Sequence, residues 1–186
     1  EEILTLCQMI VAESDQPLRI MDADAFLEPQ IAIGSIPPNK TDLNVLLGNL
    51  TRGISLMSEN KKIIFLDQEL LKEIKRRDQL EHCLKASTYN LQDFEVFYQP
   101  KIDSKTGDVI SAEALVRWYD KALGNVSPAE FIPIAESTGL ISKIDSWVLS
   151  TVMDDLTDPE SPIHNLGCVS VNMSPVQLFE PDFLPN

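Results

Sequence analysis

The sequence predicts an α/β fold in two unequal blocks joined by a long helix. In residues 1–67, segments with helical spacing of apolar side chains alternate with extended ones. Residues 68–89 keep helical spacing, whereas residues 90–186 open with two long alternating segments before helical spacing returns. A hydrophobic fraction of 44% and a charged fraction of 24% are typical of a globular protein and exclude a disordered chain.

The net charge of −14 restricts the class of partner. Residues 1–90 carry 10 basic and 14 acidic side chains, and residues 91–186 carry 5 and 15. A surface this acidic repels phosphate backbones, so we expect no polynucleotide partner. A small anionic ligand would need a metal ion or a well-placed arginine to offset the field.

Cysteine usage and hydropathy point to the cytoplasm. Cys7, Cys83 and Cys168 are widely spaced and odd in number, which indicates reduced thiols rather than a disulfide framework or a zinc site. No apolar run approaches the ~18 residues of a membrane span, and no signal peptide opens the chain. Because the first residue is Glu1, we expect a further segment upstream, which leaves room for a membrane anchor or a sensor domain there.

The first block alternates helices and strands. Residues 2–12 and 42–57 place apolar side chains on one helical face, and residues 18–21, 30–35 and 62–66 are short extended segments. The order helix–strand–strand–helix–strand is part of an α/β sandwich with too few strands to stand as a domain.

A long charged helix follows. Asp67 is a good N-cap, and Leu70, Ile74, Leu80 and Leu84 form a narrow apolar stripe as far as about Ser87. Residues 72–78 are densely charged, which is also seen in nucleic-acid-binding patches. Because acidic residues are interleaved with the basic ones, a solvated connecting helix is the better interpretation.

The second block opens with a β-hairpin, in which residues 94–102 and 109–118 alternate around a turn at residues 103–107. A helix then starts at Ser127, the N-cap of a capping box, and ends at Gly139.

A second helix over residues 142–156 and a strand over residues 168–173 follow. The order strand–strand–helix–helix–strand is typical of the first part of a barrel. We therefore expect that the chain is truncated at Asn186.

The returning strand of the hairpin carries the most informative side chains. Strand alternation puts Glu113, Leu115 and Arg117 on one face and apolar residues on the other, which we expect to pack under helices. Glu113 and Arg117 are ~13 Å apart along the strand, too far for an ion pair. A metal ion for Glu113 and a phosphate for Arg117 would each offset a costly buried charge.

Two further polar residues lie where strands are expected to end. Asn172 near the end of residues 168–173 offers a neutral oxygen ligand, and Gln99 precedes Pro100 at the end of the first hairpin strand. Asn172 alone is more often a turn-forming residue than a ligand. Spacing alone therefore leaves both a binding site and a structural role open.

Several ordered motifs resemble the EAL domain. They are Tyr98-Gln99-Pro100, residues 112–118 (AEALVRW), residues 127–133 (SPAEFIP), residues 135–141 (AESTGLI) and residues 171–174 (VNMS). The resemblance covers residues 90–186 and implies the N-terminal part of a modified TIM barrel. That family hydrolyses the bacterial second messenger cyclic di-GMP to linear pGpG.

The first block resembles the C-terminal part of a GGDEF domain. Residues 30–34 look like its late strand and residues 61–67 like its final strand, but residues 50–56 lack the Asp and Tyr of the family's segment. The resemblance implies a degenerate, non-cyclising GGDEF module in residues 1–67, a connecting helix over residues 68–89, and an EAL part from residue 90.

The EAL resemblance also implies roles for single residues. Glu113 and Asn172 match metal ligands, Arg117 matches a phosphate contact, and Gln99 and Leu115 match residues that line the dinucleotide site. Oxygen ligands alone favour Mg²⁺ or Mn²⁺ over zinc. Such ions would activate a water for in-line attack on one phosphodiester.

The family's other ligands and its catalytic Lys would lie beyond Asn186. We therefore expect this fragment alone to be inactive, with no catalytic residue of its own, and the full-length parent to be a cyclic di-GMP phosphodiesterase in signal transduction. A catalytically inactive cyclic di-GMP receptor and a scaffold that binds no nucleotide are the alternatives. A homodimer through the EAL domain and an upstream sensor domain are compatible with the resemblance.

Overall fold

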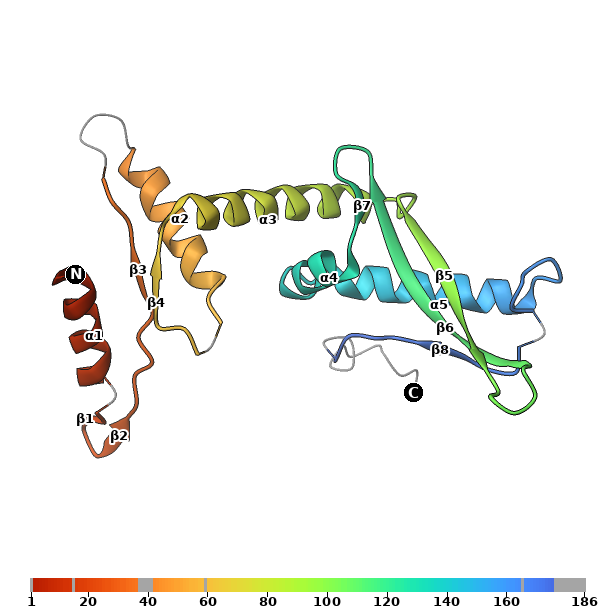
Figure 1. Cartoon of the computed structure of the whole chain (residues 1–186), viewed down its shortest axis with the longest axis horizontal. Coiled ribbons are helices and arrows are strands. Elements are labelled where there is room, and N and C mark those ends of the chain that lie inside the picture. The colour runs from red at the N-terminus through yellow and green to blue at the C-terminus, as the bar shows by residue number, and fades with distance from the viewer. Residues whose placement is uncertain (1, 15, 37–41, 59, 165, 176–186) are drawn as a thin grey trace. The chain divides into compact units, whose positions relative to one another are not determined.

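The computed structural model has an α/β fold, as predicted, and its contacts divide the chain into two compact units, Glu1–Arg76 and Arg77–Asn186 (Figure 1). It describes residues 2–14, 16–36, 42–58, 60–164 and 166–175. These units are defined by contacts, whereas the boundaries expected after residues 67 and 89 separate parts of different domain families. Those boundaries stay predictions.

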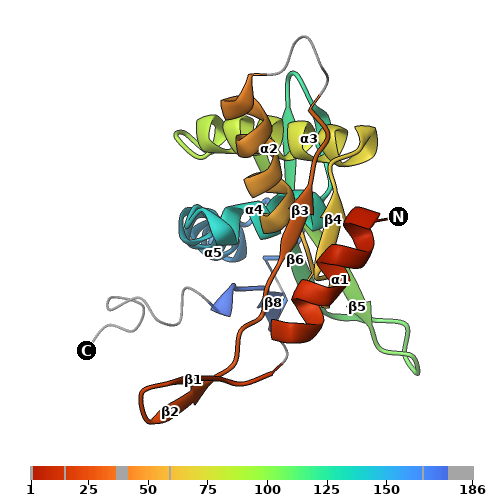
Figure 2. The same ribbon diagram turned by 90° about the vertical axis from the view of Figure 1, so that its left-hand side faces the viewer.

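The first unit alternates helices and strands. Its elements are α1 (Glu2–Ser14), β1 (Leu18–Ile20), β2 (Ala23–Ala25), β3 (Ile31–Ile33), α2 (Leu43–Ser55) and β4 (Ile63–Phe65). β1 pairs with β2 antiparallel and β3 with β4 parallel, and α2 contacts β3 (Figure 2). The expected helices and strands are present, but β2 was not predicted because Ala23-Asp24-Ala25 is only three residues long and consists of residues that are depleted in strands.

The long helix α3 spans Gln68–Ser87. The Asp67 carboxylate accepts a hydrogen bond from the Leu70 amide at 2.8 Å, which confirms the predicted N-cap. Leu70 and Ile74 pack with Ile64 in the core of the first unit, and Leu84 lies fully buried in that of the second. Every helix among the described residues, α3 included, is too short or too polar to cross a lipid bilayer.

The second unit is built on one mixed sheet (Figure 1). Its strands are β5 (Phe94–Ile102), β6 (Val109–Asp120), β7 (Gly124–Val126) and β8 (Val169–Val171). β6 pairs antiparallel with β5 and β7 but parallel with β8. The helices α4 (Pro128–Ser137) and α5 (Ile141–Thr157) connect β7 to β8.

The start and end of α4 agree with the sequence signals. The Ser127 side chain accepts a hydrogen bond from the Ala129 amide at 3.3 Å, and Pro128 occupies the first turn. Gly139 follows the helix with φ +71°, a conformation that favours glycine. The short strand β7 was not predicted, because Gly124-Asn125-Val126 is too short and polar to show a strand pattern.

The helices cover one face of the sheet. The apolar side chains of β6 face this side, as predicted: Ala112, Ala114 and Trp118 are at most 3% exposed. Trp118 meets the Phe131 ring of α4 edge-on, with centroids 5.5 Å apart. Tyr98 extends the contact from β5 to α5, where its hydroxyl donates to the Asp155 carboxylate. The opposite face of β5, β6 and β8 therefore carries the polar side chains.

A buried serine ties the end of α3 to this core. The Trp118 Nε1–H donates to the Ser87 hydroxyl oxygen at 3.1 Å, and that hydroxyl donates to a carboxylate oxygen of Asp93 at 2.7 Å. Ser87 is 2% exposed and Trp118 1%. One hydroxyl thus satisfies both a buried indole and a carboxylate at the start of β5.

Candidate functional site

The polar face of the sheet brings three strands together at Glu113. In the register of the sheet, Gln99 of β5 lies opposite Glu113 on one side, and Ser170 of β8 lies opposite it on the other. Gln99 was expected at a strand end, but β5 continues to Ile102. The Ala112 amide donates to the Cys168 carbonyl and so points away from β5. Its partner Pro100 therefore sits at a position of the ladder where no N–H is needed.

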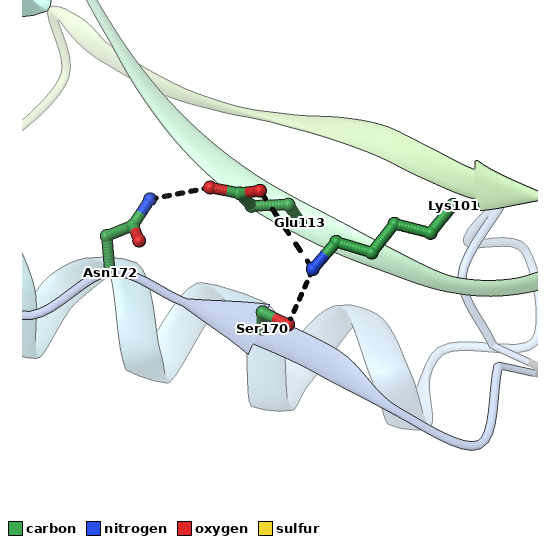
Figure 3. A network of polar contacts seen from close by, with 4 residues as sticks. All are labelled: Lys101, Glu113, Ser170 and Asn172. Carbon is green, nitrogen blue, oxygen red and sulfur yellow. Dashed lines mark hydrogen bonds and ion pairs between the residues drawn. The ribbon is translucent and has the colours of Figure 1, made fainter.

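Glu113 is the centre of a polar network (Figure 3). Its Oε1 accepts a hydrogen bond from the Asn172 Nδ2 at 2.9 Å, and its Oε2 lies 3.9 Å from the Lys101 ammonium. The ammonium also donates to the Ser170 hydroxyl at 3.0 Å. Asn172 comes directly after β8, so the parallel pairing of β8 with β6 brings together two residues that are 59 positions apart.

The charges on this face have protein partners. Glu113 contacts Lys101 and Asn172, and its side chain keeps 32% of its surface exposed. Arg117 places its guanidinium 5.5 Å from the centre of the Phe97 ring and donates to the Val116 carbonyl at 2.9 Å. Glu113 and Arg117 therefore have separate partners, as expected. The premise of a buried, unpartnered charge was wrong, because this face is partly open to solvent.

Lys101 was not among the site residues predicted from the sequence, although strand alternation could have indicated it. Strand alternation puts Lys101 on the same face as Gln99, two residues further along β5. A lysine at that position can reach a carboxylate on the neighbouring strand, since diagonal partners in a sheet lie about 7–8 Å apart.

Arg117 lies between two clefts. The first, of about 260 Å³, is lined by Leu115, Arg117 and Asn172 together with apolar residues of α4 and α5. The second, of about 490 Å³, is lined by Arg117 with Phe97 and Glu95, among others. Three of the five predicted site residues thus share the first cleft, and the other two, Gln99 and Glu113, lie opposite each other in the sheet.

Two helices anchor the segment that follows Asn172. The Ser174 amide donates to the Asp145 carboxylate of α5 at 2.9 Å, and the Ser174 hydroxyl donates to the Glu136 carboxylate of α4 at 2.8 Å. Burial raises the pKa of Asp145, which is 6% exposed; the Ser174 amide opposes this, and the nearby Glu136 charge adds to it. Asp145 could have been noticed because it falls on the buried face of α5 between Ile141 and Val148.

The pair of Glu113 and Asn172 fits a hard divalent cation. Carboxylate and amide oxygens are ligands that such an ion prefers. The Glu113 and Asn172 side-chain atoms are 2.9 Å apart, and rotating the amide would present its oxygen instead of its nitrogen. The described part of the chain holds no group of three or more His, Cys, Asp or Glu side chains that could hold a metal. The pair would therefore supply two ligands of a larger set.

The chain is similar to known proteins in sequence and in fold. The EAL domain model matches residues 80–186. Among curated proteins, the chain is 49% identical over 65 residues to the cyclic di-GMP phosphodiesterase PA2567 of Pseudomonas aeruginosa, covering 35% of this chain and 11% of that protein. It is 27% identical over 175 residues to the bifunctional diguanylate cyclase/cyclic di-GMP phosphodiesterase MucR of the same organism, covering 93% of this chain and 25% of MucR.

A solved structure extends the similarity of fold. The structure of Vibrio cholerae LapD, comprising the S helix, GGDEF and EAL parts without ligand, has a TM-score of 0.51 and 17% identity; the match covers 98% of this chain and 41% of that chain. This likeness concerns the fold alone. The chain spans about a quarter or less of the curated relatives named above. Because the family model matches more than half of its residues, the chain belongs to the EAL domain family.

Proposed function

We propose that the protein containing this chain is a metal-dependent phosphodiesterase that hydrolyses cyclic di-GMP to pGpG. The observation that carries the proposal is the contact between Glu113 and Asn172 beside Arg117, on an EAL domain. The similarity to PA2567 and MucR, both named as cyclic di-GMP phosphodiesterases, supports the same reaction.

The two ends of the site have different chemistry. Glu113 and Asn172 offer oxygen atoms to Mg²⁺ or Mn²⁺, which when bound would lower the pKa of a coordinated water and polarise the phosphodiester. Arg117, four residues further along β6, offers a planar guanidinium to the phosphate. The Phe97 ring lies beside that guanidinium and restricts its orientation.

The remaining residues shape the nucleotide site. Leu115 lies between Glu113 and Arg117 on β6 and lines the first cleft, where it would contact the dinucleotide through its apolar side chain. Gln99 sits opposite Glu113 and would donate or accept hydrogen bonds at the edge of the site. Glu136 and Asp145 would hold Asn172 in place through Ser174.

The wider organisation of the protein is part of the proposal. Residues 1–67 would be the C-terminal part of a degenerate GGDEF domain, residues 68–89 a connecting helix, and residues 90–186 the N-terminal part of an EAL-type modified TIM barrel. The LapD match over 98% of the chain supports this reading of the fold. We place the protein in the cytoplasm, with a homodimer and an upstream sensor as compatible features, and expect the 186-residue fragment to be inactive alone.

The test is to incubate the full-length protein with cyclic di-GMP and Mg²⁺ or Mn²⁺ and to separate the nucleotides by chromatography. We expect pGpG to appear, and Glu113→Gln to reduce its rate of formation at least a hundredfold, because the substitution removes a charged ligand and keeps the shape. Glu160→Gln makes the same chemical change on an exposed turn residue and should leave the rate unchanged.

Two outcomes would contradict the proposal. If the folded protein binds cyclic di-GMP without converting it, the protein is a receptor rather than an enzyme. If the protein makes pGpG and Glu113→Gln is as active as Glu160→Gln, the reaction is right and the metal assignment is wrong.

A further inference from the structure

Lys101 occupies an unusual place on the polar face of the sheet. Its ammonium lies 3.9 Å from the Glu113 Oε2 on β6 and 3.0 Å from the Ser170 hydroxyl on β8, so it links the two strands that lead to Glu113 and Asn172 (Figure 3). A cation held against a carboxylate that is itself a candidate metal ligand affects how that carboxylate binds a second cation.

We propose that Lys101 is a stand-in cation, which holds Glu113 in position when no metal is bound and lowers the affinity of the site for divalent ions. The inference rests on the proposed function, because it takes Glu113 as a metal ligand. Lys101 is a positioning residue in this scheme: it acts through Glu113 and does not take part in bond cleavage.

The two carboxylate oxygens of Glu113 have different partners. Oε1 of Glu113 faces the Asn172 amide, and Oε2 faces Lys101. The ammonium is fixed by a second contact, with Ser170, on the strand that leads directly to Asn172. The ammonium therefore holds the Glu113 carboxylate, and through Ser170 the strand that precedes Asn172, in place with a positive charge that the protein itself supplies.

The same charge opposes a divalent ion. A dication bound to Glu113 must approach within a few ångströms of the ammonium, and like charges at such distances repel. The Lys101 side chain is 46% exposed, so solvent screens much of this repulsion. In water, two unit charges 4 Å apart change a binding constant roughly fivefold. A divalent ion carries twice the charge, but on Glu113 it would lie further than about 4 Å from the ammonium. We therefore expect Lys101 to lower the binding constant for the ion about three- to tenfold.

The experiment measures metal affinity directly, without nucleotide. Free Mn²⁺ is counted by electron paramagnetic resonance during titration of the full-length protein at constant ionic strength. We expect Lys101→Met, which keeps the length of the side chain and removes its charge, to bind Mn²⁺ about three- to tenfold more tightly than the wild type. Lys101→Arg restores the charge and should return the affinity to within about twofold of the wild type.

Lys105→Met is the matched control. It makes the same change in net charge in the turn of the same hairpin, and the four residue steps from Val109 to Glu113 alone span about 13 Å of strand. This separation exceeds the Debye length of about 8 Å at physiological salt, so Lys105→Met should leave Mn²⁺ affinity unchanged.

The failures of the two proposals can be told apart. If Glu113→Gln binds Mn²⁺ as tightly as the wild type, Glu113 is not a ligand and both the metal assignment and the role of Lys101 are overturned. If Glu113→Gln weakens binding but Lys101→Met binds Mn²⁺ equally or more weakly, the metal assignment stands and only the role of Lys101 is overturned. Equal tightening by Lys101→Met and Lys105→Met would also overturn it.

Discussion

Replacing Ser87 by alanine should lower the unfolding free energy of the second unit more than a substitution of similar size on the surface of that unit. The substitution removes the hydroxyl that joins Trp118 Nε1 to Asp93, at 3.1 and 2.7 Å, while leaving little empty space. A buried donor without a partner costs about 1–3 kcal/mol, and a hydrogen bond to a charged acceptor contributes about 1.5–3 kcal/mol. Since the half-buried Asp93 can recover part of its loss from water, we expect a decrease in unfolding free energy of about 2–4 kcal/mol.

Urea denaturation followed by tryptophan fluorescence is the suitable assay. The chain has two tryptophans, Trp118 and Trp147, and both lie in the second unit. The fluorescence change therefore reports the unfolding of that unit. Ser104→Ala, in the exposed hairpin turn, is the matched control and should change the unfolding free energy by less than about 0.5 kcal/mol.

Measuring Ser87→Ala in the Trp118→Phe variant separates the contributions of the two hydrogen bonds. In Trp118→Phe the ring still packs but the N–H donor is gone, so Ser87→Ala should cost about 1 kcal/mol less there than in the wild type. A loss below about 0.5 kcal/mol in the wild type, or an equal loss in both backgrounds, would refute the reasoning that Ser87 satisfies the buried indole.

Two further predictions concern pH and backbone conformation. Because the pKa of Asp145 is raised in the folded protein, the folded state binds more protons than the unfolded state at pH values above 3.8, the ordinary pKa. The contribution of Asp145 to the unfolding free energy therefore falls as the pH rises from 3.8 through the raised pKa. Asp145→Asn should flatten that part of the pH profile of stability, measured by urea denaturation, and an unchanged profile would contradict the prediction. Gly139→Ala should lower the unfolding free energy by about 1 kcal/mol, because the φ of Gly139 is +71°. Gly48→Ala, inside α2 with open space around it, should raise the unfolding free energy by about 0.5–1 kcal/mol. Both changes are measured by denaturation followed by circular dichroism, and a change of the same sign in both variants would contradict the prediction.

Long periodic segments allowed most of the fold to be predicted. The hairpin of β5 and β6 and the helix α3 appear with nearly the expected bounds, because alternation over nine or more residues and a capped apolar stripe are strong local signals. The strands β2 and β7 have three residues each. Their pairing is decided by neighbouring strands rather than by their own composition, so the sequence pattern could not reveal them.

The positions of the candidate site residues in the sheet could be predicted only in part, because strand alternation is a local pattern. Strand alternation placed Glu113 and Arg117 on one face, and the structure agrees. The contact of Glu113 with Asn172 depends on the parallel pairing of β6 and β8, which single-strand patterns do not specify. Lys101 and Ser174 act through side-chain contacts between elements, and local periodicity does not report such contacts.

The parallel pairing of β6 and β8 also has a consequence for the order of folding. The β5–β6 hairpin closes through a turn of a few residues, so it can form early and locally. Asn172 reaches Glu113 only after α4 and α5 have crossed from β7 to β8, which closes a loop of 59 residues. During synthesis on the ribosome, Glu113 therefore emerges long before its partner, and the pair that would hold a cation cannot form until both helices have been made.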